Sequence, residues 1–266
     1  MIRIDRSHDA AATSWVRSAN GGGDFPIQNL PLGVFRRAGS DEPFRIGTAI
    51  GDQVLDLSAL AKLDLFEEQA AEALGHCGAD NLNALCAVQR AGLRALRLAL
   101  FDGLNIEAGD RMRSTLQRVL IPQDSVEHKV PFAVGDFTDF YTSLDHATNI
   151  GRVFNAPNHP PANFAHLPVA YHGRSSSLSI SGTPVVRPAG QIRPKGAEQP
   201  VFAATRALDY ELELGIFIGA SSQAGTPIEI WSAEDHIFGF CLLNDWSARD
   251  IQAWEAVPLG PFLSKS

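Results

Sequence analysis

A strict alternation of apolar and acidic residues, L-D-Y-E-L-E-L-G-I-F-I, occupies positions 208–218 of the chain. Because alternate residues of a β-strand point to opposite faces, this segment predicts a strand with one apolar and one acidic face. The acidic face carries Asp209, Glu211 and Glu213, about 6.6 Å apart at about 3.3 Å per residue. Like charges at this spacing repel one another, whereas Ca²⁺ or Mg²⁺ would draw the carboxylates together. The pattern alone leaves open a half-exposed strand with a solvated acidic face.

Two further carboxylates follow apolar runs that predict buried strands. The run I-F-G-F-C-L-L-N at 237–244 leads into Asp245, and V-P-F-A-V at 130–134 precedes Asp139. Acidic residues at strand ends commonly bind ligands, although each alone is more often a helix cap or a turn residue. Together with two carboxylates of the acidic strand they make a four-oxygen cage. Such a cage suits Ca²⁺ or Mg²⁺ and not Zn²⁺, which prefers Cys and His.

The N-terminal part of the chain combines helical and hairpin patterns. Residues 1–23 are polar and end in three glycines, which predicts a loose arm. Residues 45–57 predict a hairpin with its turn at Gly51 and Asp52. Apolar residues at helical spacing predict three helices, over 59–74, 81–101 and 107–119.

The character of the sequence changes after residue 120. The segment 121–131 ends in a proline and begins close to another, and it predicts a connector. Beyond it Pro, Gly, Ser and Asn are dense, and short β-type runs such as 177–188 alternate with turns. We therefore expect an α+β fold that is mainly β, with a small domain over 1–120 and a β-rich domain over 121–266.

The composition narrows the classes of function. The chain has 266 residues, of which 45% are hydrophobic and 20% charged, so it is globular rather than disordered. Its formal net charge of -8 argues against a general nucleic-acid binder, which needs a basic face. Cys77, Cys86 and Cys241 show no metal or redox spacing and are expected to be reduced core thiols. The start of the chain lacks an apolar signal core, and no run approaches the ~18 apolar residues of a membrane span. A cytoplasmic location is the expectation.

Several motifs resemble the fumarylacetoacetate hydrolase family. They are F-P-I-Q-N-L-P-L-G-V-F at 25–35, D-F-T-D-F-Y at 136–141, H-A-T-N-I-G at 146–151, L-P-V-A-Y-H-G-R-S-S-S at 167–177, the D-Y-E-L-E-L run, N-D-W-S-A-R-D-I-Q at 244–252 and V-P-L-G-P-F-L-S-K-S at 257–266. The resemblance covers nearly the whole chain from Phe25. It implies an N-terminal SH3-like barrel domain, a mixed β-roll and a homodimer. It also implies hydrolytic cleavage of a carbon–carbon bond in a β-diketone substrate, giving fumarate and acetoacetate at the end of tyrosine degradation.

Carried over position by position, the resemblance also implies roles for individual residues. It assigns the divalent ion to four carboxylates, Asp139, Glu211, Glu213 and Asp245, and leaves Asp209 out. It implies that His146 activates water. The groups that it assigns to the developing oxyanion are Arg249, Gln252 and Lys265. The tyrosines that it assigns to substrate contact are Tyr141 and Tyr171.

The chemistry of β-diketone cleavage suits these residue types. A metal ion supplies an electrophile for the ketone oxygens. Imidazole has a pKa near neutrality, as a water-activating base requires. The departing enolate needs cations or hydrogen-bond donors on its negative oxygen. Taken singly, His146, Arg249 and Tyr171 also have ordinary structural interpretations, as a loop histidine, a surface helix residue and a packed aromatic.

Three departures from the family pattern affect these expectations. Asn155 stands where the family has a substrate-contacting arginine, and Ala256 stands where it has a tyrosine. Family members also continue well beyond the position of Lys265, with a threonine near the metal and a glutamate that orients the histidine. The chain is therefore expected to be the N-terminal portion of such an enzyme. On its own it is expected to be poorly stable and essentially inactive, because a β-roll cut after one strand exposes unpaired edges.

Two alternatives to this hydrolase stay open. One is a related acylpyruvate hydrolase or oxaloacetate-type decarboxylase with the same metal cage, which the 25–35 motif argues against because such relatives usually lack this domain. The other is a non-catalytic remnant or partner-binding subunit, which Asn155 and Ala256 motivate.

Overall fold

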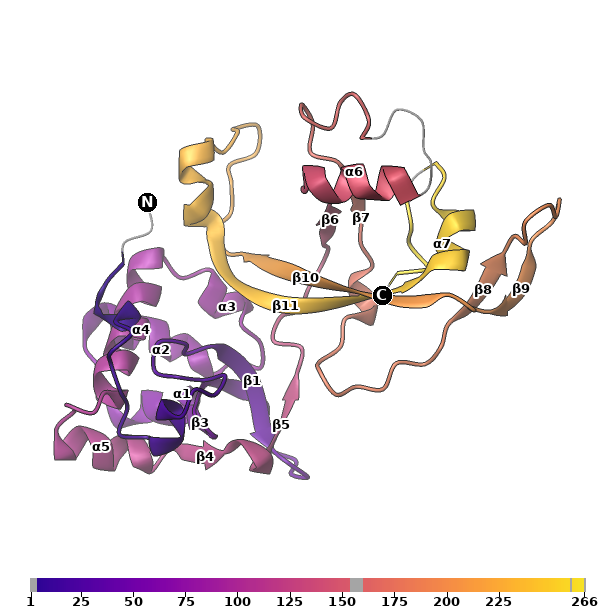
Figure 1. The fold of residues 1–266 in the computed structure, drawn as a ribbon. Coiled ribbons are helices and arrows are strands. Elements are labelled where there is room, and N and C mark those ends of the chain that lie inside the picture. Colours follow the sequence, from indigo (N-terminus) through magenta and orange to yellow (C-terminus); the bar gives the residue numbers. More distant parts are fainter. Residues whose placement is uncertain (1–3, 154–159, 259, 266) are drawn as a thin grey trace. The chain divides into compact units, whose positions relative to one another are not determined.

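A computed structural model describes residues 4–153, 160–258 and 260–265 of the chain (Figure 1). The fold is mixed α/β with antiparallel sheets, and it divides into two compact units. Unit 1 comprises residues up to Ala133 together with Gly215–Cys241, and unit 2 comprises Val134–Leu214 together with Leu242–Ser266. The two long strands β10 (Leu208–Ile218) and β11 (Ile237–Ala248) pair with each other, and each contributes residues to both units.

Unit 1 is built on a five-stranded antiparallel sheet in the order β4-β3-β2-β1-β5. Its strands are β1 (Leu32–Arg37), β2 (Arg45–Ile50), β3 (Gln53–Asp56), β4 (Leu120–Pro122) and β5 (Val126–Lys129). In the described part of the chain β4 and β5 are the two edges of this sheet, and a closed SH3-like barrel is not confirmed. The predicted hairpin at 45–57 is confirmed, with Gly51 in the turn at a φ of 56°.

The predicted connector at 121–131 is wrong, because most of this segment lies in the sheet. Leu120 to Pro122 pair with β3, and Val126 to Lys129 pair with β1. Pro122 ends its strand, a position at which proline sacrifices no ladder hydrogen bond. Pro122 therefore marks the end of a strand, and Pro131 follows two residues after the end of β5.

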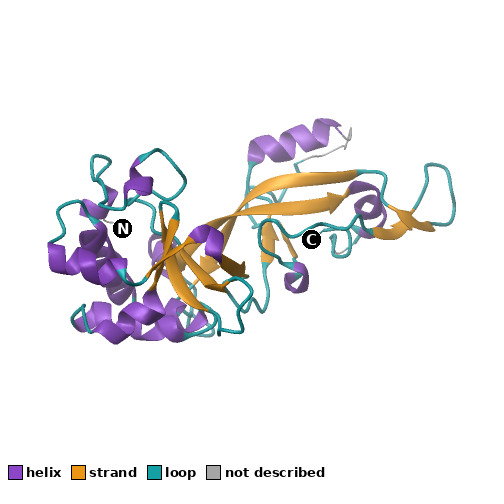
Figure 2. Cartoon of the chain, turned by 90° about the horizontal axis from the view of Figure 1, so that it is seen from below, coloured by secondary structure: helices purple, strands orange, loops and turns teal. Residues whose placement is uncertain are grey.

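Helices lie beside this sheet (Figure 2) and supply half of the main cluster of buried residues in unit 1. They are α1 (Leu57–Leu60), α2 (Glu68–Gly75), α3 (Asn83–Cys86), α4 (Arg90–Leu104) and α5 (Asp110–Gln117). The prediction at 107–119 is confirmed as α5. The segment predicted as one helix at 59–74 is two, because Asp64 adopts a left-handed conformation that ends the first piece. The segment 81–101 is likewise divided into α3 and α4.

The predicted loose arm at the N-terminus is wrong for residues 5–20, because this segment packs on the rest of unit 1. Ser14 bridges to Asn105 and donates to the Leu104 carbonyl at 2.6 Å, and Val16 lies in the core. A Cβ on Gly51 would lie 2.3 Å from the Ser18 hydroxyl, so the turn requires glycine for close approach as well as for its φ. Polar composition misled the prediction, since these side chains are occupied in hydrogen bonds.

Unit 2 consists of short elements around its parts of β10 and β11. Two small antiparallel sheets pair β6 (Thr138–Phe140) with β7 (Ala170–His172) and β8 (Ala189–Ile192) with β9 (Val201–Ala204). Its helices are α6 (Leu144–Val153) and α7 (Arg249–Glu255). The Asp250 carboxylate in the first turn of α7 accepts from the Thr205 hydroxyl and the Arg206 N–H, which ties α7 to the segment before β10.

The apolar faces of β10 and β11 are exposed, which contradicts the burial predicted for the run at 237–244. On β10 the exposed fractions range from 51% at Ile216 to 77% at Leu212, and Leu242 on β11 is 80% exposed. The acidic face of β10 is the more buried one. The alternation therefore predicts the position of the strand correctly. It does not predict which of the two faces is covered by other described residues.

Candidate metal and oxyanion site

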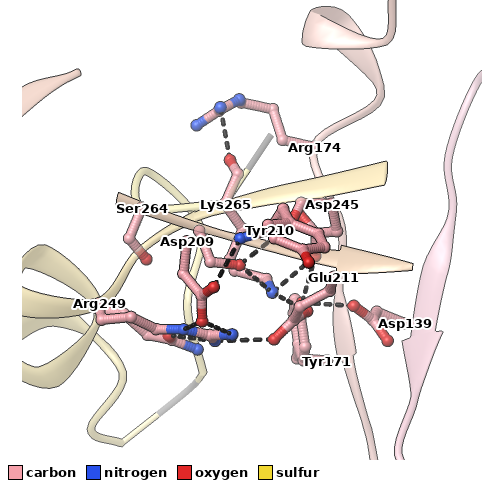
Figure 3. A network of polar contacts seen from close by, with 12 residues as sticks. Asp139, Tyr171, Arg174, Asp209, Tyr210, Glu211, Asp245, Arg249, Ser264 and Lys265 are labelled. Atoms are coloured by element: carbon pink, nitrogen blue, oxygen red, sulfur yellow. Dashed lines mark hydrogen bonds and ion pairs between the residues drawn. The ribbon is translucent and has the colours of Figure 1, made fainter. Parts of the chain in front are cut away.

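The acidic face of β10 lies beside several of the side chains that the sequence singled out, all in unit 2 (Figure 3). They are Asp139, Tyr171, Asp245, Arg249 and Lys265. Asp209, Glu211 and Glu213 point to this face, and each meets different partners. Asp209 binds a guanidinium, Glu211 binds two cations, and Glu213 joins two other carboxylates. Along β10, the carboxylates at the start of the strand therefore pair with cations, and Glu213, farther along, lies among other carboxylates.

The anionic end is a cluster of Asp139, Glu213 and Asp245, which we name the carboxylate cluster. One carboxylate oxygen from each of the three lies within 4.8 Å of the other two. Asp139 pairs with Tyr171 in the β6–β7 register, and Asp245 lies inside β11 rather than at its end as predicted. Strands separated by many residues therefore bring the three carboxylates together.

Electrostatic repulsion within the carboxylate cluster changes the pKa of the Glu213 carboxyl group. Burial, and then the negative charges of Asp139 and Asp245, raise the pKa of Glu213 from 4.5 to about 8. Burial is also the largest influence on Asp245, whose pKa is raised even though Lys265 lies beside it. The charged forms are costly here because one lysine does not balance three carboxylates.

The geometry and the donor chemistry of the cluster fit a hard divalent cation. Oxygens that share one Ca²⁺ at about 2.3–2.6 Å lie at most about 5 Å apart, and the 4.8 Å limit in the cluster satisfies this. An all-carboxylate set suits Ca²⁺ or Mg²⁺ rather than Zn²⁺. Asp139, Glu213 and Asp245 are thus the residues that would hold an ion.

Tyr171 bridges two members of the cluster. Its hydroxyl donates to Asp139 and lies 3.4 Å from an oxygen of Asp245. Burial, and then the hydrogen bond to Asp139, raise the pKa of the Tyr171 phenol, so it stays a donor. A phenol in this position orients the two carboxylates.

Glu211 lies outside the carboxylate cluster and binds the two cations of the site. It forms ion pairs with Lys265 and, at 2.7 Å, with Arg249. Burial is the largest single influence and opposes its charge, but the hydrogen bonds and positive charges of Lys265 and Arg249 together outweigh burial and lower the pKa of Glu211. The structure thus gives Glu211 cationic partners where the family pattern implied a metal.

Arg249 is held at the start of α7 by three acceptors. Its Nε and a terminal nitrogen bind Asp209 at 3.0 and 2.9 Å, and its other terminal nitrogen binds Glu211 and the Gln252 amide oxygen, the latter at 3.1 Å. Its backbone N–H donates to the Ala207 carbonyl at 2.9 Å. Two nitrogens on one oxygen of Asp209, together with Glu211 and Gln252 on the third nitrogen, fix the guanidinium plane.

Lys265 is the second cation of the site, and only 5% of its side chain is exposed. Its ammonium group lies 2.8 Å from Asp245, donates to the Ser247 hydroxyl at 2.6 Å and pairs with Glu211. Every partner is thus supplied by β10 or β11. The site as a whole offers two fixed cations beside a group of carboxylates that would bind another.

Comparison with known sequences identifies the family. Residues 28–131 match the fumarylacetoacetase N-terminal domain, and residues 136–266 match the fumarylacetoacetate (FAA) hydrolase C-terminal domain. The chain belongs to the fumarylacetoacetase family. Among curated relatives, it is 46% identical to rat fumarylacetoacetase, 47% to the mouse protein and 44% to the human protein. Each alignment covers 91% of this chain and 58% of the relative, so the chain spans just over half the length of these relatives.

A more distant solved structure is also similar. The fumarylacetoacetate hydrolase of the psychrophilic bacterium Exiguobacterium antarcticum aligns with 20% identity and a TM-score of 0.43, over 89% of this chain and 62% of that one. This similarity is too low to support an argument. In the described part of the chain no helix is long and apolar enough to cross a membrane.

Other residues that the fumarylacetoacetase family pattern implied lie on separate elements. His146 is in the first turn of α6, not on a loop as predicted, and its ring packs edge-on against Tyr141 at 5.4 Å. Gln252 contacts Arg249 on α7. Ala256 follows α7 directly, whereas Asn155 lies outside the described residues.

The sequence interpretation missed two residues of this fumarylacetoacetase-family site. Asp209, which the resemblance leaves out of the metal site, also lies outside the carboxylate cluster and binds Arg249 through two nitrogens. Ser247 holds the Lys265 ammonium, and the signal was available, because Ser247 is two residues from Asp245 and therefore on the same face of β11.

Proposed function

We propose that the protein is a metal-dependent hydrolase that cleaves the carbon–carbon bond of 4-fumarylacetoacetate to give fumarate and acetoacetate. One observation carries the proposal: two fixed cations, Arg249 and Lys265, converge on Glu211 beside the carboxylate cluster. Cleavage of a β-diketone requires an electrophile at the ketone oxygens and positive charge at the departing enolate. Names of relatives that are 44–47% identical support this choice of substrate.

Within this proposal the chain's own residues divide the work. Asp139, Glu213 and Asp245 would hold a divalent ion, Mg²⁺ or Ca²⁺, and the family pattern adds Glu211 as a fourth carboxylate. When bound, the ion polarises the ketone oxygens of the substrate as a Lewis acid. Tyr171 holds two of the carboxylates in place through its hydroxyl.

The proton and charge transfers are assigned to the remaining residues. His146 removes a proton from the attacking water, a role that histidine fills more often than other side chains. Arg249, Lys265 and Gln252 bind the oxygen on which negative charge develops as the enolate leaves. Tyr141, beside His146, contacts the substrate. Pre-fixed cations lower the barrier because they need little reorganisation during the reaction.

The wider proposal includes the remaining family expectations. These are an SH3-like arrangement of the N-terminal sheet, a complete β-roll, a homodimer, a cytoplasmic location and a role at the end of tyrosine degradation. They are supported by the two domain matches, which together run from residue 28 to 266.

A chimera tests the activity independently of chain length. Residues 25–265 would replace the matching region of rat fumarylacetoacetase, and formation of fumarate and acetoacetate would be measured with and without added Mg²⁺ or Ca²⁺. The proposal predicts turnover that needs the divalent ion and is lost on His146→Ala. A folded chimera that cleaves no diketone, or one that keeps turnover after His146→Ala, contradicts the proposal or the role of that histidine, respectively.

A further inference from the structure

Two side chains of opposite charge, Glu255 and Arg174, form hydrogen bonds with the backbone of the segment that contains Lys265. On one side, a single carboxylate oxygen of Glu255, at the end of α7, faces consecutive backbone N–H groups. It accepts from the N–H of Phe262, from that of Leu263 at 2.7 Å and from that of Ser264 at 3.1 Å, and also from the Ser264 hydroxyl at 3.1 Å. Consecutive N–H groups that point to one place form a concave site for an anion.

On the other side, Arg174 binds the carbonyl groups of the same segment. Its two terminal nitrogens donate to the Phe262 carbonyl at 2.7 Å and to the Lys265 carbonyl at 2.6 Å, the second visible in Figure 3. Its Nε donates to Ser177, and the guanidinium lies 5.8 Å from the centre of the Phe262 ring. The fork of the arginine thus spans the segment from 262 to 265.

The two contacts match the polarity of the peptide group. A carboxylate accepts from N–H donors and a guanidinium donates to C=O acceptors, and hydrogen bonds to charged groups are the stronger class. A third anchor comes from β11, where the Ala248 N–H donates to the Ser264 carbonyl at 2.8 Å and Ser247 bridges to Lys265. The Cα of Lys265 is therefore fixed from three directions.

This fixation matters because a lysine side chain is long and flexible. From its observed backbone position the Lys265 ammonium reaches Asp245, Glu211 and Ser247 together. Ordering such a side chain costs conformational entropy, and a backbone that moves would release it. Neither Glu255 nor Arg174 is among the residues that the family pattern implied.

We propose that Glu255 and Arg174 are positioning residues that clamp residues 262–265 by their N–H and C=O groups and thereby lock the Lys265 ammonium beside Asp245 and Glu211. Glu255 acts through the backbone rather than on substrate, since the oxygen it presents is already occupied by four donors. The catalytic meaning of this clamp rests on the proposed function, whereas the clamp itself does not.

Site-resolved lysine labelling of the 266-residue chain tests the clamp without any turnover. The chain has four lysines, Lys62, Lys129, Lys195 and Lys265, so mass spectrometry after brief reductive methylation reports each one. Lys62 and Lys195 are exposed references, and Lys129 is a part-buried lysine of unit 1 that reports general unfolding. In the wild type Lys265 reacts slowest because it is buried.

The measured quantity is the labelling rate of Lys265 divided by that of Lys129. Glu255→Ala and Arg174→Ala each raise this ratio by about tenfold or more, which corresponds to about 1.4 kcal/mol. Glu255→Gln gives a smaller rise because the amide keeps an uncharged acceptor. The matched controls, Glu198→Ala and Arg206→Ala, change exposed residues of the same unit and leave the ratio unchanged. An unchanged ratio in Glu255→Ala and Arg174→Ala overturns the proposal. This includes the case in which the labelling rates of Lys265 and Lys129 rise by the same factor.

The same substitutions in the chimera connect the clamp to catalysis. Glu255→Ala lowers kcat with little change in KM, and Glu255→Gln restores part of kcat, because the lost group acts on Lys265 rather than on bound substrate. If the wild-type chimera is inactive, the proposed function fails while the labelling ratio still decides the clamp. If the substitutions raise the labelling ratio of Lys265 but leave kcat unchanged, the clamp only stabilises the fold, and its catalytic role is refuted.

Discussion

The ammonium group of Lys265 lies 2.8 Å from a carboxylate oxygen of Asp245, and the two side chains are only 5% and 6% exposed. Removing one partner of a buried ion pair leaves the other charge without compensation, which is more costly than the pair is worth. Lys265 therefore stabilises unit 2 by neutralising buried carboxylates, in addition to its proposed catalytic role.

Lys265→Met preserves the length of the side chain and removes its charge. In the presence of a chelator we expect the free energy of unfolding to fall by about 3 kcal/mol, because Asp245 and Glu211 lose their counter-charge. Added Mg²⁺ restores part of the loss by supplying positive charge to the same carboxylates. Chemical denaturation followed by tryptophan fluorescence measures both effects, with Lys195→Met as the control on an exposed lysine. Equal loss in the two variants would contradict the buried pair.

Glu213 gives the clearest pH dependence. Its pKa rises from 4.5 to about 8 in the folded, metal-free chain, so the unfolded chain gives up this proton at lower pH. Between these pH values the folded state binds more protons than the unfolded state, and stability falls as the pH rises. Glu213→Gln removes this penalty, so in chelator the variant is more stable than wild type at pH 8, by at least about 1 kcal/mol after solvent screening.

The advantage of Glu213→Gln disappears below about pH 4.5, where the wild-type carboxyl is protonated in both states. Thermal melts at several pH values measure this difference, with Glu198→Gln as the exposed control. If the variant were equally or less stable than wild type in chelator at pH 8, the crowding of charge around Glu213 would be wrong.

Asp209 is expected to act through Arg249. Arg249→Ala in the chimera lowers kcat by about 10²–10³, the cost of losing one donor at a developing oxyanion. Asp209→Asn leaves Glu211 and Gln252 to hold the guanidinium, so its effect on kcat is smaller, about tenfold. Arg206→Ala serves as the matched arginine control. A larger loss from Asp209→Asn than from Arg249→Ala would show that Asp209 acts by another route.

Asp5 tests the packed N-terminal segment. Burial opposes its charge, but hydrogen bonds from Ser7 and Arg94 outweigh burial and lower its pKa to about 2. Because its folded pKa lies below the ordinary 3.8, Asp5 stabilises the fold above that pH, and the contribution is lost as the pH falls toward 2. Asp5→Ala also removes a helix cap and lowers stability by about 1–2 kcal/mol at pH 7. Thermal melts compare Asp5→Ala with Asp41→Ala, a change at an exposed aspartate. Equal stability of the two variants would indicate that the N-terminal segment is a loose arm.

The sequence located the site better than the fold around it. Alternation placed Glu211 and Glu213 on one face, and apolar runs pointed to Asp139 and Asp245, because these signals are local. Which carboxylate meets a cation was not predictable from spacing, since Lys265 and Arg249 reach Glu211 from segments far along the chain.

The errors in the fold have the same physical origin. The arm at Ile4–Asn20 is polar, but its hydrogen-bond partners, such as Asp102 for Arg6, lie far away in sequence. The prolines near 121–131 indicated a linker because proline marks strand ends as well as turns. The exposure of Leu212 and Leu242 does not follow from the alternation itself, because periodicity reports that a face is apolar and not what covers it.

Isothermal titration calorimetry of the metal-free chain with Mg²⁺ and with Ca²⁺ tests most directly whether the carboxylate cluster is a cation site. The cluster of Asp139, Glu213 and Asp245 predicts one ion per chain, with binding abolished by Asp139→Asn combined with Asp245→Asn and unchanged in the exposed control Glu198→Gln. Circular dichroism confirms that each variant is folded. Absence of binding by the folded wild-type chain, or binding that survives the double substitution, would contradict the metal site on which the proposed chemistry depends.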